Sequence, residues 1–467
     1  MDAVTANKIW NDYSTNRTAM LRLWDYYRGD HDIMDREEEY PDGAEKTNRV
    51  TDWAGYIVDL YVGALTMVPF QVSADQEDSS DAVERYSEIG KRSGFDALDM
   101  ELLRRTLVFG WCIELHEYRE GEGEIVRLQD PTEWVILRDV YDNIAVAIRV
   151  VTLPINTIVD GEPLKTERYQ MTVYDEREII RYEKGGNTNQ WNEVERRTHY
   201  YGKPPVVVWQ VNEERNSILT DALLGQADEY NEIDSSAGDS LRSTVSALLA
   251  LIGYDASWVK DNADTIKEMR ILPLAPDGDA KFIVRPDTSN EADHRLQRIR
   301  EHICMAGRVP DITTITGATG STSGIALRLR FMPMEHRSMS MANFIRDSIT
   351  QRIDLINAMA EKTNKPVLED YTVTVQFILP TNRIEEWQNV GALKGIVSHR
   401  KMLEVMSDVQ DPEGELEAVT NEILMSEDDR EEGIERVAGL LQPAAEDAMQ
   451  AVSRAVMDAI EQRGLLE

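Results

Sequence analysis

Residues 317–331 read GATGSTSGIALRLRF, so a run of glycine, serine and threonine leads directly into an apolar and basic stretch. Glycine-rich loops that open a helix often hold phosphate, because their backbone amides approach it closely. A Walker A loop needs G-x-x-x-x-G-K-[ST], in which the lysine neutralises the phosphates. The sixth position from Gly317 is Thr322, and no lysine or arginine occurs from 309 to 327. We therefore do not expect this loop to bind a nucleotide.

Other catalytic and metal-binding motifs are also missing from the sequence. The seven histidines form no H-E-x-x-H motif, the two cysteines cannot form C-x-x-C, and G-x-S-x-G does not occur. Some of the 85 acidic residues will lie close together in space, but their number makes any single pair uninformative. The sequence predicts no catalytic residue, no metal site and no cofactor, and we expect no enzyme.

The charge of the chain limits its partners. Asp and Glu total 85 against 50 Lys and Arg, which gives a formal net charge of −35. Such a chain is a poor sequence-independent DNA binder, because affinity for the phosphate backbone comes mainly from Lys and Arg. Cys112 and Cys304 lie in apolar or helical segments, and we expect two buried thiols and a reducing compartment.

No targeting or membrane segment is apparent. The first residues, MDAVTANKIWNDYS, lack the continuous apolar region of a signal peptide. Apolar runs such as 245–252 are far shorter than the ~20 residues of a membrane helix. We expect a protein that is soluble and intracellular when it is made, with no membrane partner.

The elements that would position these segments follow from the spacing of apolar residues. A chain of 467 residues should hold roughly two to four structural units. Residues up to about 110 show helical spacing, whereas 112–211 show the period-two pattern of short antiparallel strands separated by turns. From 219 the chain is helical again.

The helix expected near 231–256 carries a stripe of small residues. It either packs tightly in a core or packs against copies of itself, and the pattern leaves both readings open. The members of this stripe are Ser236, Ser240, Ser243, Ala247 and Ala250.

The segments that follow are a small α/β insert and two further helices. Within 257–288, RILPLA and AKFIVRP are predicted strands joined by a turn. On the next helix, Arg295, Arg298 and His302 line one face, which by itself is typical of a solvated surface. A long helical pattern after 324 contains Pro333, which should kink or interrupt it.

Five segments of the chain resemble the portal proteins of tailed bacteriophages, in the long-tailed-phage branch. YYRGDHDI at 26–33 is similar to the family's Tyr-Tyr-x-Gly-x-His/Asp-x-Ile opening. The segment at 48–72 is similar to its Asn-Arg helix, although the family's Gly-x-Pro is here Thr-Met-Val-Pro. The other three segments are 221–241, 323–335 and 378–404. Each is weak alone, but five in the right order over more than 350 residues are specific.

The resemblance implies an α+β, mainly helical portal fold with wing, stem, clip and crown, which assembles into a ring with a central tunnel. Residues 1–230, with part of 324–398, would form the wing, helical to about 110 and antiparallel β over 112–211. The remaining expected parts are a first stem helix at 231–256, the clip at 257–288, a second stem helix at 289–308, a tunnel loop at 309–323, a long kinked helix with a return strand at 324–398, and a helical crown at 399–467.

The resemblance also implies a function at one vertex of the capsid. The ring, usually of twelve subunits, would conduct double-stranded DNA during packaging and ejection without reading its sequence. Implied partners are the terminase large subunit, the major capsid and scaffolding proteins, and a head-completion adaptor, with assembly in the bacterial cytoplasm before incorporation into the virion. The sequence alone also allows an acidic scaffold protein or a nucleotide-dependent hydrolase.

Within that ring, individual residues acquire expected roles. The small-residue stripe would be a subunit interface, and Pro333 would allow the bend below the tunnel loop. Arg295, Arg298 and His302 would face the lumen as weak phosphate contacts, or would pair with acidic groups of a neighbour. The residues expected to face DNA in the tunnel loop are Thr313, Thr314, Thr316, Gly317, Thr319, Ser321 and Thr322.

Overall fold

The structure is a computed structural model, and it describes residues 3–37, 46–74, 80–159, 162–185, 190–245, 248–252, 279–283, 289–311 and 324–377, with short stretches between 390 and 419. The chain divides into two compact units. The first comprises Met1–Ser321 and Arg328–Ile378, and the second comprises Thr322–Leu327 and Leu379–Glu467. In the second unit, the described residues include the short helix α11 (His399–Val405).

Helices open the first unit, as the sequence predicts. They are α1 (Ala3–Tyr27), the 3-10 turn η1 (Asp32–Asp35), α2 (Trp53–Thr66), α3 (Ser80–Ser93) and α4 (Phe95–Phe109). The Asp52 side chain caps α2 by accepting the Gly55 N–H at 2.7 Å. Gly110 ends α4 with a φ of 90°, where any Cβ would collide with the carbonyl of Arg215. The chain therefore passes directly from α4 into the first sheet.

Two antiparallel sheets follow and confirm the β region expected at 112–211. One has the order β3-β2-β9 and the other β4-β5-β6-β7-β8. The strands are β2 (Trp111–Arg119), β3 (Gly123–Gln129), β4 (Trp134–Arg138), β5 (Ile144–Val159), β6 (Glu162–Tyr174), β7 (Glu178–Gly185), β8 (Asn192–Thr198) and β9 (Val206–Gln210), with a 3-10 turn η3 (Pro131–Glu133) before β4.

The sheets and helices stack in layers. Ile9 and Tyr13 of α1 pack on one face of the five-stranded sheet, against Ile148 and Met171. The other face of that sheet packs on the three-stranded sheet, where Ile113 and Leu115 meet Trp134 and Tyr174. Because side chains alternate along a strand, Glu114 and His116 of β2 lie on the opposite face.

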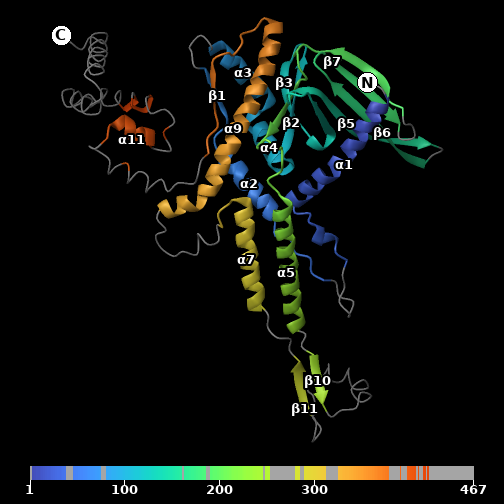
Figure 1. Cartoon of the computed structure of the whole chain (residues 1–467), viewed down its shortest axis with the longest axis vertical. Coiled ribbons are helices and arrows are strands. Elements are labelled where there is room, and N and C mark those ends of the chain that lie inside the picture. Colours follow the sequence, from blue (N-terminus) through green and yellow to red (C-terminus); the bar gives the residue numbers. More distant parts are fainter. Residues whose placement is uncertain are drawn as a thin grey trace. The chain divides into compact units, whose positions relative to one another are not determined.

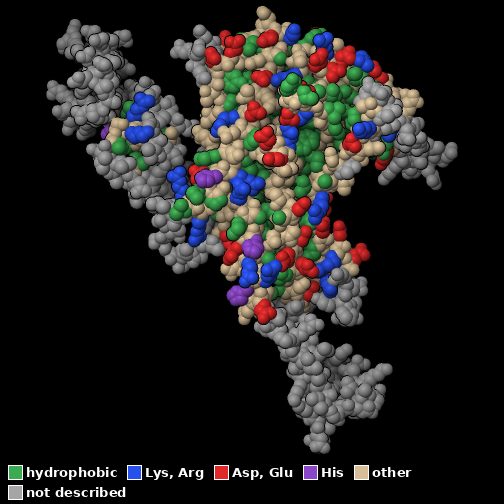
Figure 2. Space-filling view, viewed as in Figure 1, with side chains coloured by type: hydrophobic (Ala, Val, Ile, Leu, Met, Phe, Trp, Pro, Cys, Tyr) green, Lys and Arg blue, Asp and Glu red, His purple; other side chains and the backbone are tan. Residues whose placement is uncertain are grey.

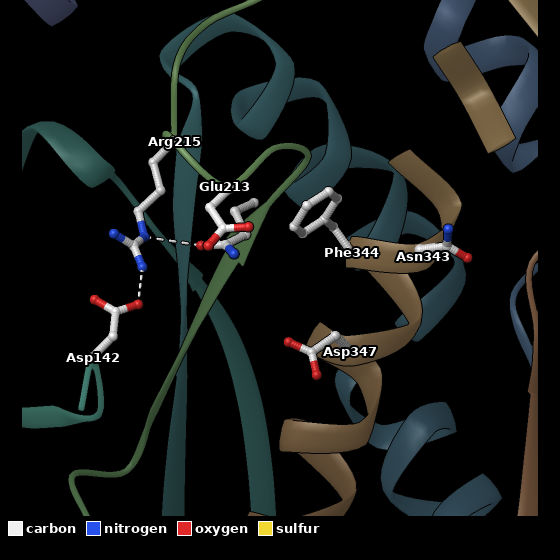
Figure 3. Close-up of a pocket in the computed structure, with 7 residues that line it drawn as sticks. Asp142, Glu213, Arg215, Asn343, Phe344 and Asp347 are labelled. Carbon is white, nitrogen blue, oxygen red and sulfur yellow. Dashed lines mark hydrogen bonds and ion pairs between the residues drawn. The ribbon is translucent and has the colours of Figure 1, made fainter. Parts of the chain in front are cut away.

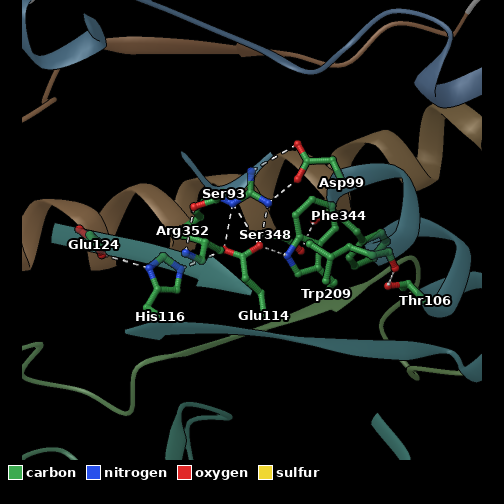
Figure 4. Close-up of polar contacts among 12 residues, drawn as sticks. Ser93, Asp99, Thr106, Glu114, His116, Glu124, Trp209, Phe344, Ser348 and Arg352 are labelled. Atoms are coloured by element: carbon green, nitrogen blue, oxygen red, sulfur yellow. Dashed lines mark hydrogen bonds and ion pairs between the residues drawn. The ribbon is translucent and has the colours of Figure 1, made fainter. Parts of the chain in front are cut away.

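That opposite face holds a network of buried charges (Figure 4). Arg352 of the long helix α9 (Gly324–Thr363) is fully buried and donates to Glu114, with Nε 2.9 Å from Oε1, and also to Asp99 of α4. His116 lies between two carboxylates, with Nε2 2.9 Å from Glu114 Oε1 and Nδ1 3.2 Å from Glu124 Oε1. Arg85 closes the row at 3.6 Å from Glu124. With His116 protonated, charges of opposite sign alternate along the whole row.

The electrostatics of this row predict how stability depends on pH. Burial alone would lower the pKa of His116, but its hydrogen bonds to the two carboxylates raise it above 6.5. Burial alone would raise the pKa of Glu114, but Arg352 and His116 lower it to about 2. The His116 contribution is therefore complete below pH 6.5 and is lost as pH rises through the folded pKa. The Glu114 contribution is complete above about pH 4.5 and is lost as pH falls towards 2.

We therefore expect the free energy of unfolding to be highest between about pH 4.5 and 6.5, as far as these two groups determine it. Urea unfolding of the full-length protein between pH 5.5 and 8.5 measures the alkaline side. His116→Gln should flatten the decline, whereas His199→Gln should not, because burial lowers the pKa of His199 and a lowered pKa makes stability rise with pH. A decline of equal slope in His116→Gln would show that another group titrates.

The segment expected to form the first stem helix ends earlier than predicted. Helix α5 (Asp221–Val245) stops before 248, and residues 248–252 form strand β10 (Leu248–Ile252), paired antiparallel with β11 (Asp279–Ile283). The helix expected over 231–256 is thus wrong at residues 248–252. Short apolar runs such as LLALI fit a strand as well as a helix, and pairing with β11 decides between them. The other predicted strand of the insert, RILPLA, lies outside the described residues.

The last elements of the first unit agree with their predictions. Helix α7 (Ser289–Gly307) precedes α9, and α9 continues through Pro333 while curving in its N-terminal part (Figure 1). The return strand β12 (Tyr371–Thr374) pairs with β1 (Gln71–Ala74). Cys112 and Cys304 are buried free thiols, as expected. Over the described ranges, no helix combines the length and apolar character needed to cross a membrane.

Candidate functional site

Helices α5 and α7 pack side by side and extend away from the two sheets (Figure 1). Ile299 and Ile303 are fully buried on the inner face of α7. Arg295 adds an exposed ion pair between the two helices, since its Nε lies 3.0 Å from Glu229 Oε1 on α5. One member of the predicted basic face is therefore paired within its own chain.

The other two members of that face remain open to solvent. Arg298 and His302 are exposed on α7, and basic and histidine side chains gather over this helix in Figure 2. Within the described ranges, no carboxylate lies within 4 Å of Arg298, and no cation lies within 4 Å of Glu232 on α5. Both residues are thus available to a partner, which Arg295 is not.

The small-residue stripe is only partly helical. Ser236 lies on α5 and is exposed, so it does not pack in the core of its own chain. Ser240 and Ser243 lie on α5 too, but Ala250 belongs to strand β10, which corrects the expected continuous stripe. The structure does not describe Ala247, nor the tunnel-loop residues Thr313, Thr314, Thr316, Gly317, Thr319, Ser321 and Thr322.

An extended segment, residues 46–52, runs along α5 and is attached by a ladder of hydrogen bonds. The N–H groups of Thr51, Arg49 and Thr47 donate to Asn231 Oδ1, Ser235 Oγ and Asp239 Oδ1. The three distances are 2.8, 2.9 and 3.2 Å. All three acceptor residues are buried. We call residues 46–52 the strap.

The ladder works because two periodicities nearly coincide. Two residues of extended chain advance about 6.4–6.8 Å, whereas four residues of α-helix advance about 6.0 Å. Alternate strap residues therefore meet every fourth residue of α5, with a mismatch that accumulates along the ladder. The Arg49 side chain passes close to Gly238, where a Cβ would lie 2.9 Å from the guanidinium carbon and would require that flexible side chain to shift. The three hydrogen bonds together set the register of the strap on α5.

The strap and α1 meet at a buried histidine. Because Asn231 Oδ1 accepts from Thr51, its Nδ2 faces His31 and donates to Nδ1 at 2.9 Å. His31 Nε2 then donates to the Tyr26 carbonyl at 3.2 Å, so the ring is neutral, and burial lowers its pKa accordingly. The Tyr26 ring stacks on His31, and its hydroxyl donates to Asp228 at 2.9 Å.

A second junction lies at the C-terminal end of α7, next to the helices of the body. The Gly307 carbonyl accepts from the Tyr61 hydroxyl of α2 at 3.1 Å and from Arg337 of α9 at 3.3 Å. A Cβ at Gly307 would lie 2.8 Å from Ile57 Cδ1, so any other residue would force the buried Ile57 side chain to shift. Helices α2, α7 and α9 are therefore joined at one carbonyl group.

A comparison with models of protein families identifies the family of this chain. The family model described as phage portal protein, SPP1 Gp6-like, matches residues 6–429 of the chain. The chain belongs to this family of phage portal proteins. A search of the curated proteins found no match. The portal protein is thus a structural component of the capsid of a tailed phage, at the portal vertex.

Three segments that resemble the family in sequence converge in the portal protein at one place. The YYRGDHDI segment supplies Tyr26 and His31, the Asn-Arg segment supplies the strap, and the helix at 221–241 supplies their partners. This convergence forms the root of the α5–α7 pair.

Two sets of residues in the portal protein escaped the sequence analysis. The strap acceptors share a spacing of four, visible as N-x-x-x-S-x-x-x-D in 231–239, which marks one face of a helix. The buried charges had a weaker signal, namely Glu114 and His116 alternating with apolar residues in CIELHEY. Arg352 itself carries no local signal, because its carboxylate partners are more than 230 residues away in sequence.

Proposed function

We propose that the portal protein closes into a ring of twelve copies whose α5–α7 pairs surround the DNA conduit for packaging and ejection. In this ring, α5 and α7 act as the stem, residues 257–288 as the clip, 309–323 as the tunnel loop and 399–467 as the crown. The proposed partners are double-stranded DNA, the terminase large subunit, the major capsid and scaffolding proteins and a head-completion adaptor. Assembly would take place in the bacterial cytoplasm.

The exposed face of α5 is the observation that carries this proposal. Gly225, Glu232 and Ser236 follow one another along that face, and all three are exposed in the single chain. Two of the three are small, which allows the backbone of another helix to approach closely. This exposed face of α5 could therefore contact the next copy of the subunit in a ring.

The distribution of charge supports passage of DNA rather than tight binding. A net charge of −35 repels phosphate over most of the surface. For Arg298 we favour an acidic partner on the neighbouring copy. Exposed carboxylates such as Glu232 lie on α5, so α5 of one copy could present them to Arg298 on α7 of the next. His302 remains a candidate for a weak phosphate contact in the lumen.

Electron microscopy of the purified protein tests the ring directly. We expect closed rings with a central hole, and twelve subunits in rings taken from capsids. Preparations that contain only monomers or small oligomers at every protein and salt concentration would contradict the proposal.

Substitution of Ser236 tests the α5 face as a subunit interface. Ser236→Leu should leave the single chain folded, because the side chain is exposed, but should overpack the helix contact and reduce ring assembly at least about tenfold. Mass photometry measures the assembly and circular dichroism checks the fold. Ser14→Leu, at an exposed position of α1, is the matched control. Normal rings in Ser236→Leu would remove this face from the interface.

The tunnel loop is tested separately from the ring. Deletion of residues 313–321 should leave ring assembly intact and impair packaging or retention of DNA in particles. Loss of rings in this variant would refute the proposed division of labour between loop and stem.

A further inference from the structure

The loop between β4 and β5, residues 139–143, presents two bare apolar side chains. Val140 is 91% exposed and Tyr141 83% exposed, the highest values among large hydrophobic residues over the described part of the chain. Exposed apolar residues are common singly, but two adjacent ones at a loop tip are a feature of contact surfaces. We call residues 139–143 the knob.

Hydrogen bonds hold the knob in one conformation. Asp139 Oδ1 accepts the N–H groups of Tyr141 at 2.8 Å and Asn143 at 2.9 Å. Asp142 has a φ of 65°, and its carbonyl accepts from Arg138 at 2.7 Å. Arg215 forms an ion pair with the Asp142 side chain. The apolar tip is therefore presented by a rigid loop, which lowers the entropy cost of docking.

An acidic pocket of about 490 Å³ opens beside the knob (Figure 3). Glu213 and Asp347 line it together with Phe344, and within the described ranges neither carboxylate has a cation within 4 Å. Arg215, which also lines the pocket, is already occupied by Asp142 and by Gln210 at 2.9 Å. The knob and its pocket thus combine bare apolar surface with uncompensated negative charge.

The N-terminal part of α9 has the opposite character. Leu329, Met332 and Met339 recur at helical spacing on its outer face and are 61%, 43% and 52% exposed. Arg328 and Arg330 flank this face and are also exposed, although Arg328 forms an ion pair with Glu335 at 3.7 Å. Phe331 and Met334 on the inner face are buried, so the outer face is unpartnered within its own unit. We call the outer residues the α9 stripe.

We propose that the knob and acidic pocket of one subunit dock on the α9 stripe of the next subunit in the ring. This inference rests on the proposed ring, in which every subunit has two permanent neighbours. A closed ring requires two different surfaces per subunit that complement each other. The two surfaces match in both respects, because each is apolar at its centre and their flanking charges are opposite. Tyr141 is the expected anchor, since rigid aromatic side chains dominate binding at such contacts.

Chemical cross-linking of assembled full-length protein tests this contact. Tyr141→Cys combined with Leu329→Cys, treated with a bismaleimide, should give a ladder of covalent oligomers up to the size of the ring. The native thiols Cys112 and Cys304 are buried and should not react. A mixture of the two single variants should stop at dimers, because each subunit then offers only one of the two partners. The control pair Tyr200→Cys with Leu329→Cys, with Tyr200 62% exposed elsewhere, should give no ladder.

Charge reversal supplies a second readout. Glu213→Arg with Asp347→Arg, or Arg330→Glu alone, should raise the subunit concentration for half-assembly at least about tenfold, and combining them should restore part of the loss. The contact would be overturned, and the proposed function left intact, if the wild type forms rings but the assembled Tyr141→Cys/Leu329→Cys variant gives no ladder. A Tyr141→Cys single variant that cross-links to itself would overturn the contact as well. Absence of rings in wild-type protein would overturn both.

Discussion

Replacing Arg352 with methionine is expected to lower the free energy of unfolding by about 3–5 kcal/mol. The guanidinium is fully buried and donates to both Glu114 and Asp99, so its removal leaves two buried carboxylates without their main counter-charge. Methionine matches the length of the aliphatic stem, which limits the cavity that the change creates. Urea unfolding followed by tryptophan fluorescence measures the loss, since Trp209 donates to Glu114 at 2.8 Å within the network.

The control for this prediction lies on the same helix. Arg346 is exposed and contacts Asn343, so Arg346→Met should change the free energy of unfolding by less than about 0.5 kcal/mol. Arg352→Lys should recover only part of the stability, because lysine cannot reach both carboxylates with a planar fork. A stability of Arg352→Met equal to that of the wild type would show that the two carboxylates take up protons at no cost.

Asn231→Ala should have the second-largest effect, about 2–4 kcal/mol. The Asn231 side chain accepts from the strap at Thr51 and donates to His31, and both partners would be left unsatisfied in a buried site. The strap should detach first, because this residue holds its best-formed rung. Limited trypsin digestion of the full chain, with cleavage after Arg49 identified by mass spectrometry, should therefore accelerate more than overall unfolding does.

Glu232→Ala is the control for this experiment. Glu232 is exposed one residue further along α5, and its removal should not release the strap. If trypsin cuts Asn231→Ala and wild type after Arg49 at the same rate, the ladder does not hold the strap.

Much of the fold follows from local patterns in the sequence. The change from helical spacing to period two near residue 111 located the sheets, because alternating apolar residues in segments such as CIELHEY fix one buried face. Strand β8 lies within that region but could not be located by its own pattern, since all of its residues are exposed and NEVERRT shows no apolar alternation. Strand β10 was taken for helix because LLALI has no period of its own and depends on a partner 27 or more residues away.

The candidate site was predictable only through resemblance. The segments that meet at the root were recognised as separate matches, but nothing in the strap itself shows that its backbone donates to side chains of α5. Contacts of this kind depend on two distant segments at once, whereas periodicity reports one segment at a time. The sequence likewise could not show that Arg295, expected as a phosphate contact in the lumen, already pairs within its own chain. Its partner Glu229 lies on the other helix.

The buried charge row also has a consequence for the chain while it is being synthesised, because its members are made at different times. Arg352 follows Glu114 by 238 residues, which at about 5–20 residues per second takes roughly 12–48 seconds of translation. Until Arg352 leaves the ribosome, Asp99 and Glu114 lack the guanidinium that pairs with both of them, and His116 is the cation that Glu114 contacts. A chain that ends before Arg352 therefore cannot complete the buried charge row.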